Sequence, residues 1–245
     1  MIWLPLGFFA TALLYASVGF GGGSTYSALL ALVGFDFRLL PILSLACNIL
    51  VVTGSCIRFA RAGTMPWRGA LTVSLIAAPL AFLGGLTPIK EAHFLLLLGI
   101  SLVLAGLALL LPRAPERDGA PTSIARYMPV AAAPLGYLAG LVGIGGGIFL
   151  APLLHLTRWN EARRIAATTS LFILINSIAG LIGQLAKNGA ARFGEALSGG
   201  LPLLIAVVIG GQLGSLLALR ILPEWAIRWL TAALTIWAGS RLLLG

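Results

Sequence analysis

Charged side chains are scarce in this chain. Asp, Glu, Lys and Arg make up only 9% of its 245 residues, whereas 59% are hydrophobic and the mean hydropathy is +1.03. A soluble domain of this length cannot bury that much apolar surface. The composition therefore excludes an ordinary soluble protein and predicts an all-α polytopic membrane protein whose surroundings are a lipid bilayer.

Acidic side chains are the rarest charged class, and their positions matter more than their number. All seven fall between apolar segments or at segment ends: Asp36, Glu91, Glu116, Asp118, Glu161, Glu195 and Glu224. No carboxylate is placed at mid-membrane to bind a cation or relay a proton, which argues against a metal or cation transporter. We expect no metal site and no cofactor. The two cysteines, Cys47 and Cys56, do not share a helical face and are expected to be buried free thiols.

Catalytic motifs are also missing. The chain has no H-E-x-x-H and no G-x-S-x-G, and the nearest approach to the latter, residues 16–19, lacks the leading glycine. We therefore predict that the protein is not an enzyme, and a membrane-embedded enzyme is the least favoured alternative. The basic residues are dispersed among the gaps between apolar segments and form no patch for nucleic acid.

Glycine, in contrast, is concentrated in two matching runs. Val18-Gly19-Phe20-Gly21-Gly22-Gly23 returns as Val142-Gly143-Ile144-Gly145-Gly146-Gly147. Each glycine in a helix interior costs roughly 1 kcal/mol relative to alanine, so three in succession should interrupt a helix. Irregular backbone at membrane depth is tolerated only where protein surrounds it or where it lines a water-filled cavity.

The apolar residues form ten segments. Their approximate ranges are 2–18, 23–35, 39–60, 68–87, 91–111, 126–142, 147–157, 163–186, 195–221 and 224–244. Most approach the roughly 20 residues needed to cross the hydrocarbon core. The second and seventh are too short and begin at the glycine runs, so we predict broken or re-entrant short helices there. Whether these two span or re-enter the membrane is left open.

The two halves of the chain repeat. An offset of 124 aligns the glycine runs, and an offset of 126 aligns Ser44-Leu45 with Ser170-Leu171 and Gly84-Gly85 with Gly210-Gly211. Five segments per copy is an odd number, so the second copy enters the membrane inverted. We predict a first transmembrane repeat over 1–111, a cytoplasmic linker over 112–125 and a second, inverted repeat over 126–245.

The basic residues orient this arrangement. Eleven lie in alternate gaps: Arg58, Arg61, Arg68, Arg113, Arg117, Arg126, Arg158, Arg163, Arg164, Arg220 and Arg228. The opposite side has five: Arg38, Lys90, Lys187, Arg192 and Arg241. Because basic loops stay in the cytoplasm, we expect a multi-pass protein of the bacterial inner membrane with both termini in the periplasm.

The glycine runs are candidate anion sites. A helix that starts after such a run points its free N–H groups and its positive dipole end back at the break, where glycine lets an oxyanion approach closely. We expect the substrate-binding residues to be Gly19, Gly21, Gly22, Gly23, Ser24, Thr25, Asn48, Gly143, Gly145, Gly146, Gly147, Thr169, Ser170 and Asn176.

Two simpler interpretations stay open at this point. Gly19 with Gly23 and Gly143 with Gly147 each form a G-x-x-x-G, which commonly marks close helix packing. The hydroxyl groups are as well suited to bonding their own helix. His155, the one titratable side chain expected at membrane depth, has either a proton-linked role or a packing role.

At these residues the chain resembles the TauE/SafE family of sulfite exporters and related sulfur-oxyanion permeases. The resemblance rests on the doubled glycine run, on Pro152-Leu153-Leu154 after its second copy, and on Ala167-Thr168-Thr169-Ser170, and it covers essentially the whole chain. It implies a carrier of small anions such as sulfite or organosulfonates, with export as the expected direction. The first copy has Ala28 where the second has Pro152, so the two half-sites are expected to contribute unequally.

The sequence thus predicts a secondary transporter of a small sulfur-containing anion. Alternating access would expose one midplane site, built from the two glycine runs, first to one side and then to the other. A channel-like anion pore is the alternative. The exact anion, the transport direction, the coupling ion and the oligomeric state stay open, with a homodimer as one candidate.

Overall fold

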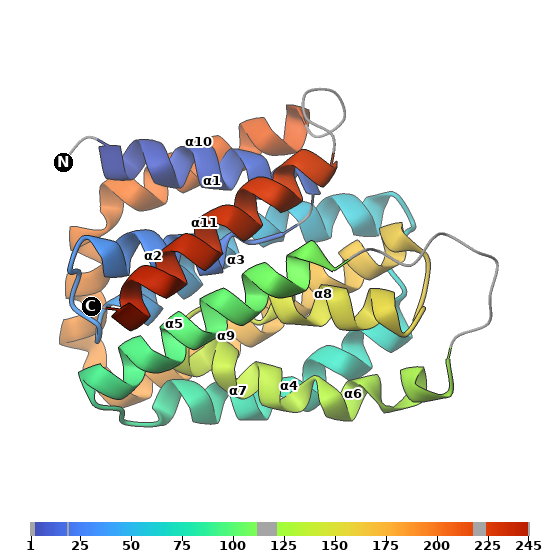
Figure 1. Ribbon diagram of the computed structural model, residues 1–245, viewed down its shortest axis with the longest axis horizontal. Helices are drawn as coiled ribbons and strands as arrows, with labels where there is room; N and C mark the ends of the chain where they lie inside the picture. The colour runs from blue at the N-terminus through green and yellow to red at the C-terminus, as the bar shows by residue number, and fades with distance from the viewer. Residues whose placement is uncertain (1–2, 19, 112–121, 218–223, 245) are drawn as a thin grey trace.

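The computed structural model describes residues 3–18, 20–111, 122–217 and 224–244, which form helices joined by short turns (Figure 1). The first half contains α1 (Trp3–Val18), α2 (Gly23–Leu32), α3 (Leu40–Arg61), α4 (Trp67–Leu86) and α5 (Glu91–Leu110). The second half contains η1 (Ser123–Tyr127), α6 (Met128–Ala131), α7 (Ala133–Val142), α8 (Gly147–Leu156), α9 (Ala162–Gly199), α10 (Leu201–Leu217) and α11 (Glu224–Leu244). The all-α polytopic fold predicted from the composition is confirmed.

The outer surface is apolar in a way that suits lipid. Leu75, Leu104, Ile182 and Ile205 are each more than half exposed. Among the described residues, α3, α4, α5 and α9 are each long and apolar enough to cross a membrane. Large exposed aliphatic side chains on such helices are stabilised by hydrocarbon and not by water.

The two halves interlock. Helix α1 packs on α10, α4 packs on α7, and α5 packs on α11 (Figure 1). Glycine allows the closest of these approaches at matched positions, because a methyl group added at Gly84 would meet the Tyr137 carbonyl oxygen and one added at Gly210 would meet that of Phe9. Each of these contacts joins one repeat to the other, as expected for two copies related by a two-fold axis.

The central helices α3 and α9 run in opposite directions. Leu39 and Ile42, at the start of α3, cluster with Ala196 near the end of α9, whereas Cys56 near the end of α3 clusters with Ala167 and Leu171 near the start of α9. The central helices of the two repeats are therefore antiparallel, as an inverted second copy requires.

Two segment boundaries differ from the sequence prediction. The expected gap at 187–194 is shorter than predicted: α9 spans Ala162–Gly199, but its helix is interrupted at Gly189, where the backbone is not helical (φ 79° and ψ 165°). The residues just before this break are helical, and there Asn188 Nδ2 donates to the Gln184 carbonyl and Lys187 Nζ donates to the Thr87 carbonyl. The predicted segment 126–142 is instead divided among η1, α6 and α7.

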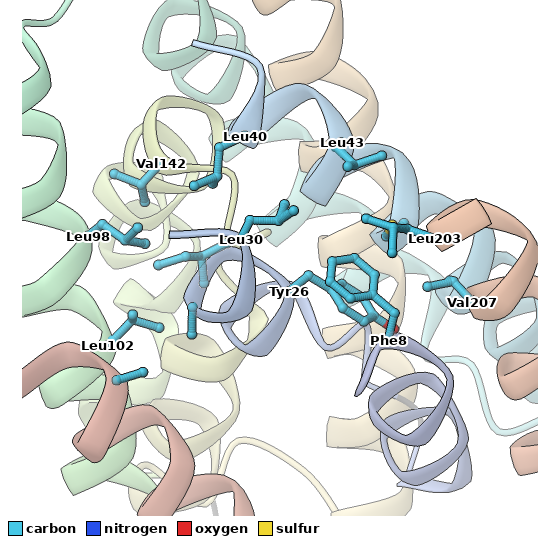
Figure 2. Close-up of a cluster of buried hydrophobic side chains, with 14 of the residues drawn as sticks. Phe8, Tyr26, Leu30, Leu40, Leu43, Leu98, Leu102, Val142, Leu203 and Val207 are labelled. Carbon is cyan, nitrogen blue, oxygen red and sulfur yellow. The ribbon is translucent and has the colours of Figure 1, made fainter. Parts of the chain in front are cut away.

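Helix α2 is enclosed by protein. Figure 2 shows Tyr26 and Leu30 among labelled residues of α1, α3, α5, α7 and α10, and the same cluster includes residues of α8 and α11. The Tyr26 ring stacks on that of Phe8 with 4.8 Å between ring centroids. Apolar packing on all sides therefore holds this short helix, and with it the glycine break at its start.

Candidate functional site

Both glycine runs interrupt a helix. Helix α1 ends at Val18 and α2 begins at Gly23, while α7 ends at Val142 and α8 begins at Gly147. The residue before each short helix is a left-handed glycine, with φ of 78° at Gly22 and 72° at Gly146. Since a side chain at such a position would be strained, glycine is required there. The prediction of broken helices is confirmed, and an unbroken G-x-x-x-G packing face is not what these residues form.

The short helices have equal geometry. Both are ten residues long and begin at matched glycines, although α8 contains Pro152 where α2 contains Ala28. The missing proline therefore does not alter where the first short helix starts. In each helix the first N–H groups lack an acceptor within the helix and point back toward the break.

Asn48 of α3 lies between the two breaks. A methyl group added at Gly21 would be 2.5 Å from Asn48 Oδ1, and one added at Gly145 would be 2.6 Å from Asn48 Nδ2. A methyl group at Gly23 would collide with the same amide and would lie 2.5 Å from the Ile144 carbonyl oxygen. The absence of side chains at these three glycines is what makes room for the amide.

The Asn48 amide is buried without hydrogen bonds. Its side chain is fully inaccessible, and neither Nδ2 nor Oδ1 has a partner among the described residues. Leaving a buried polar group unpaired costs about 1–3 kcal/mol, so such groups call for an explanation. A ligand that takes up the free Nδ2–H is one explanation consistent with the neighbouring helix start.

Ser44, one turn earlier on α3, ties the breaks together. Its single hydroxyl proton is shared between the Gly143 carbonyl at 2.9 Å and the Gly23 carbonyl at 3.1 Å, and its oxygen accepts from the Ser27 hydroxyl at 3.0 Å. One face of α3 therefore touches both repeats at their irregular backbone.

A small cavity opens beside Asn48. It is lined by Tyr15, Phe20, Gly21, Gly22, Gly23, Ser24, Asn48, Ile144, Ile148 and Ile173. These lining side chains are all uncharged. The space available to the centre of a water-sized molecule is about 10 Å³, which is about one water molecule. In this conformation the cavity has room for little more than one water-sized molecule.

The predicted site residues separate into two groups. The cavity brings together Gly21, Gly22, Gly23, Ser24 and Asn48. Thr25 lies next to it, with its hydroxyl 2.8 Å from that of Tyr15. Gly19 lies outside the described residues.

The predicted residues of the second repeat are set back from the cavity wall. Gly145 abuts Asn48 and Ile173, and Gly147 abuts Ile173 and Thr169. Ser170 and Asn176 each donate to a carbonyl of their own helix, at 3.0 and 2.8 Å. Thr169 Oγ1 and Asn176 Oδ1 are buried, and neither atom has a partner in the part of the chain that the structure describes.

The half-sites differ in the side chain that covers each glycine run. Asn48 lies against Gly21 and Gly23 of the first run and against Gly145 of the second, whereas Ile173 lies against Gly145 and Gly147 only. The amide therefore faces both half-sites, and the second half-site is in addition covered by an aliphatic side chain. His155 lies in the last turn of α8, half-buried and away from the cavity lining, and its proton-linked role stays a prediction.

Sequence reasoning missed five lining residues: Tyr15, Phe20, Ile144, Ile148 and Ile173. Phe20 and Ile144 are the variable positions inside the glycine runs, so their place beside the break could have been inferred from the motif. Tyr15, Ile148 and Ile173 carry no comparable signal, because an apolar or aromatic residue in a membrane helix is equally typical of a lipid-facing surface.

Comparison with known proteins decides the family. A model of the family described as Sulfite exporter TauE/SafE matches residues 3–242. This chain belongs to that family. It is 34% identical over 249 residues to a "Probable membrane transporter protein" of Sinorhizobium fredii, covering 99% of this chain and 98% of the relative.

More distant relatives carry the same description. A protein of Xylella fastidiosa is 30% identical over 82% of this chain and 78% of its own length, and one of Methanocaldococcus jannaschii is 26% identical over 74% and 70%. No solved structure matches the chain significantly. TauE/SafE is a transporter family, so this chain is a multi-pass membrane transporter.

Proposed function

We propose that this TauE/SafE protein carries a small sulfur-containing anion, sulfite or an organosulfonate, across the bacterial inner membrane by alternating access. The observation that carries this proposal is the amide of Asn48, which is buried beside the start of α2 and has no hydrogen-bond partner among the described residues. The free N–H groups of α2 and the Asn48 Nδ2–H are donors without a formal charge, and they suit an oxyanion.

The balance of energies favours a singly charged substrate. A helix N-terminus contributes about 0.3–1 kcal/mol for an anion, and up to about 2 kcal/mol in partly buried geometry. Desolvating an ion costs several kcal/mol and rises with its charge. Without a cationic side chain in the cavity lining, a monoanion such as bisulfite or a sulfonate is bound more readily than a dianion such as sulfate.

Substrate binding requires the cavity to enlarge. Ile144, Ile148 and Ile173 form the aliphatic side of the lining, and displacement of these side chains would add volume and expose the start of α8. In this mechanism Asn48 and the start of α2 bind the anion first. The start of α8 then supplies further donors to the anion as the repeats move relative to each other.

The first test measures thermal stability of the purified protein with sulfite, sulfate, thiosulfate, sulfoacetate and taurine. A ligand that binds only the folded state raises the melting temperature. We expect stabilisation by sulfite or sulfoacetate, with a larger sulfite effect at acidic pH, where more bisulfite is present. Stabilisation by sulfate as large as that by sulfite would contradict the proposal. So would the absence of stabilisation by any of the five compounds.

Flux through proteoliposomes separates a carrier from a pore. A carrier saturates at low substrate concentration and shows counterflow. Rates far above about 10³ per second, the upper end of ordinary turnover numbers, would favour the channel-like alternative.

A further inference from the structure

Arg58 is a half-buried cation near the end of α3 that is not used by the cavity. Its Nη2 donates to the Ala16 carbonyl oxygen at 3.1 Å and to the Ser55 hydroxyl at 3.1 Å. Its Nη1 is buried and lacks a hydrogen-bond partner throughout the described parts of the chain. The guanidinium therefore has an unused donor in a region shielded from water.

Arg58 has a counterpart in the second repeat. The offsets that align the repeats, 124 for the broken helices and 126 for the central ones, place Ala16 on Gly140 and Arg58 on Gln184. Gln184 Nε2 donates to the Gly140 carbonyl oxygen at 3.0 Å. In both repeats, then, a long side chain of the central helix holds a carbonyl in the last turns of the helix that leads into the glycine break.

Arg58 and Gln184 differ in charge and in whether all their polar atoms are hydrogen-bonded. Gln184 is fully buried, and its Oε1 accepts from Asn188 Nδ2 at 3.1 Å, so both ends of its amide are paired. Arg58 has a full positive charge and a spare donor. The arginine therefore has a capacity for an anion that the glutamine lacks.

Arg58 is also connected to the cavity. It holds the carbonyl of Ala16, and the adjacent residue Tyr15 lines the cavity and contacts the Thr25 hydroxyl. Ser55, its other acceptor, shares the face of α3 that carries Asn48. Along this side of α3, Asn48 is followed by the buried Val51 and Val52 and then by Ser55, and Arg58 lies about 15 Å from Asn48 along the helix axis.

We propose that Arg58 is a second anion-binding residue, between the cavity and the Arg61 end of α3, and that Gln184 is its uncharged counterpart toward the opposite side. The inference rests on the proposed anion transport. The spare Nη1–H donor binds the oxyanion as it leaves or approaches the cavity. As a result the two access routes differ in affinity for the substrate.

The natural pair supplies the decisive variant. Arg58→Gln installs the residue that already performs the carbonyl contact in the second repeat, so it removes the charge and keeps a donor for Ala16. We expect its KM for sulfite in proteoliposomes to rise about tenfold, the effect of losing a hydrogen bond to a charged group. The maximal rate should change less than KM, and the melting temperature without sulfite should stay near that of the wild type.

Arg61→Gln is the matched control, because Arg61 is exposed at the end of the same helix. It should leave KM within twofold. Arg58→Lys keeps the cation, should stay within about threefold of the wild-type KM, and keeps the proposal testable should Arg58→Gln fail to fold. A wild-type KM in Arg58→Gln, or a tenfold rise in a stable Arg58→Lys, would overturn the inference while leaving anion transport intact. Absence of sulfite and sulfonate transport in the wild type would instead refute the proposed function, and this inference with it.

Discussion

The Ser44 hydroxyl lies 2.9 Å from the Gly143 carbonyl oxygen and 3.1 Å from that of Gly23, so one side chain of α3 joins the irregular backbone of both repeats. Asn48, one turn later, touches glycines of both runs. The centre of the molecule is thus organised by two polar residues on one helix face, and the predictions below separate their structural role from their functional one.

Replacing Ser44 tests the structural tie. Ser44→Ala leaves two buried carbonyl groups without this donor, so we expect the free energy of unfolding to fall by about 1–3 kcal/mol. Ser74→Ala is a suitable control, since Ser74 is equally buried but bonds only the Ala70 carbonyl of its own helix. Thermal unfolding of the two variants in one detergent gives the comparison, and equal melting temperatures would argue against the tie.

Replacing Asn48 should raise stability and abolish substrate binding. Asn48→Leu keeps the number and branching of the side-chain heavy atoms and removes a buried amide that lacks partners in the described structure, so we expect a melting temperature a few degrees above that of the wild type. The shift produced by sulfite should disappear in the same experiment. A variant that is less stable, or one that sulfite still stabilises, would show that the amide is paired in solution or plays no part in binding.

Adding a single methyl group at Gly23 should block transport. Gly23→Ala places Cβ against the Asn48 amide and 2.5 Å from the Ile144 carbonyl oxygen. Gly194→Ala provides the control, because no atom lies within 4 Å of its added methyl group. We expect Gly23→Ala to insert into the membrane yet to show at least a tenfold loss of sulfite flux, with Gly194→Ala unaffected. Normal sulfite flux through Gly23→Ala would show that the first glycine break is not part of the transport site.

The orientation of the protein can be tested with fusions. With both termini in the periplasm, a C-terminal alkaline phosphatase should be active and a C-terminal green fluorescent protein dark. Fusions after Arg61 should give the opposite result, because the basic end of α3 is expected in the cytoplasm. The reverse pattern would place Arg58 on the periplasmic access route and Gln184 on the cytoplasmic one.

The sequence predicted the helices and their interruptions well, since both depend on local composition. Three successive glycines break a helix wherever they occur, and the boundaries of α2 and α8 follow directly. It predicted less well how long the gaps between helices are. Lys187 and Asn188 indicated the start of a gap of several residues, but both are helical and hydrogen-bonded to carbonyls, and the interruption is confined to Gly189.

The composition of the cavity was only partly predictable. Asn48 was identified because a mid-membrane amide needs a partner, but its position between Gly21 and Gly145 depends on how the two repeats cross. Ile173 lies against Gly145 and Gly147 of the second run, and no periodicity distinguishes such a residue from one that faces lipid. Contacts between repeats set the asymmetry of the site.

The pairing of α1 with α10 and of α4 with α7 has a consequence for assembly. Neither half of the chain contains the packing partners of its own outer helices, so a half synthesised alone would leave glycine-lined grooves facing lipid. Two fragments cut between α5 and η1 should be degraded when expressed singly and should reassemble into a working carrier when expressed together.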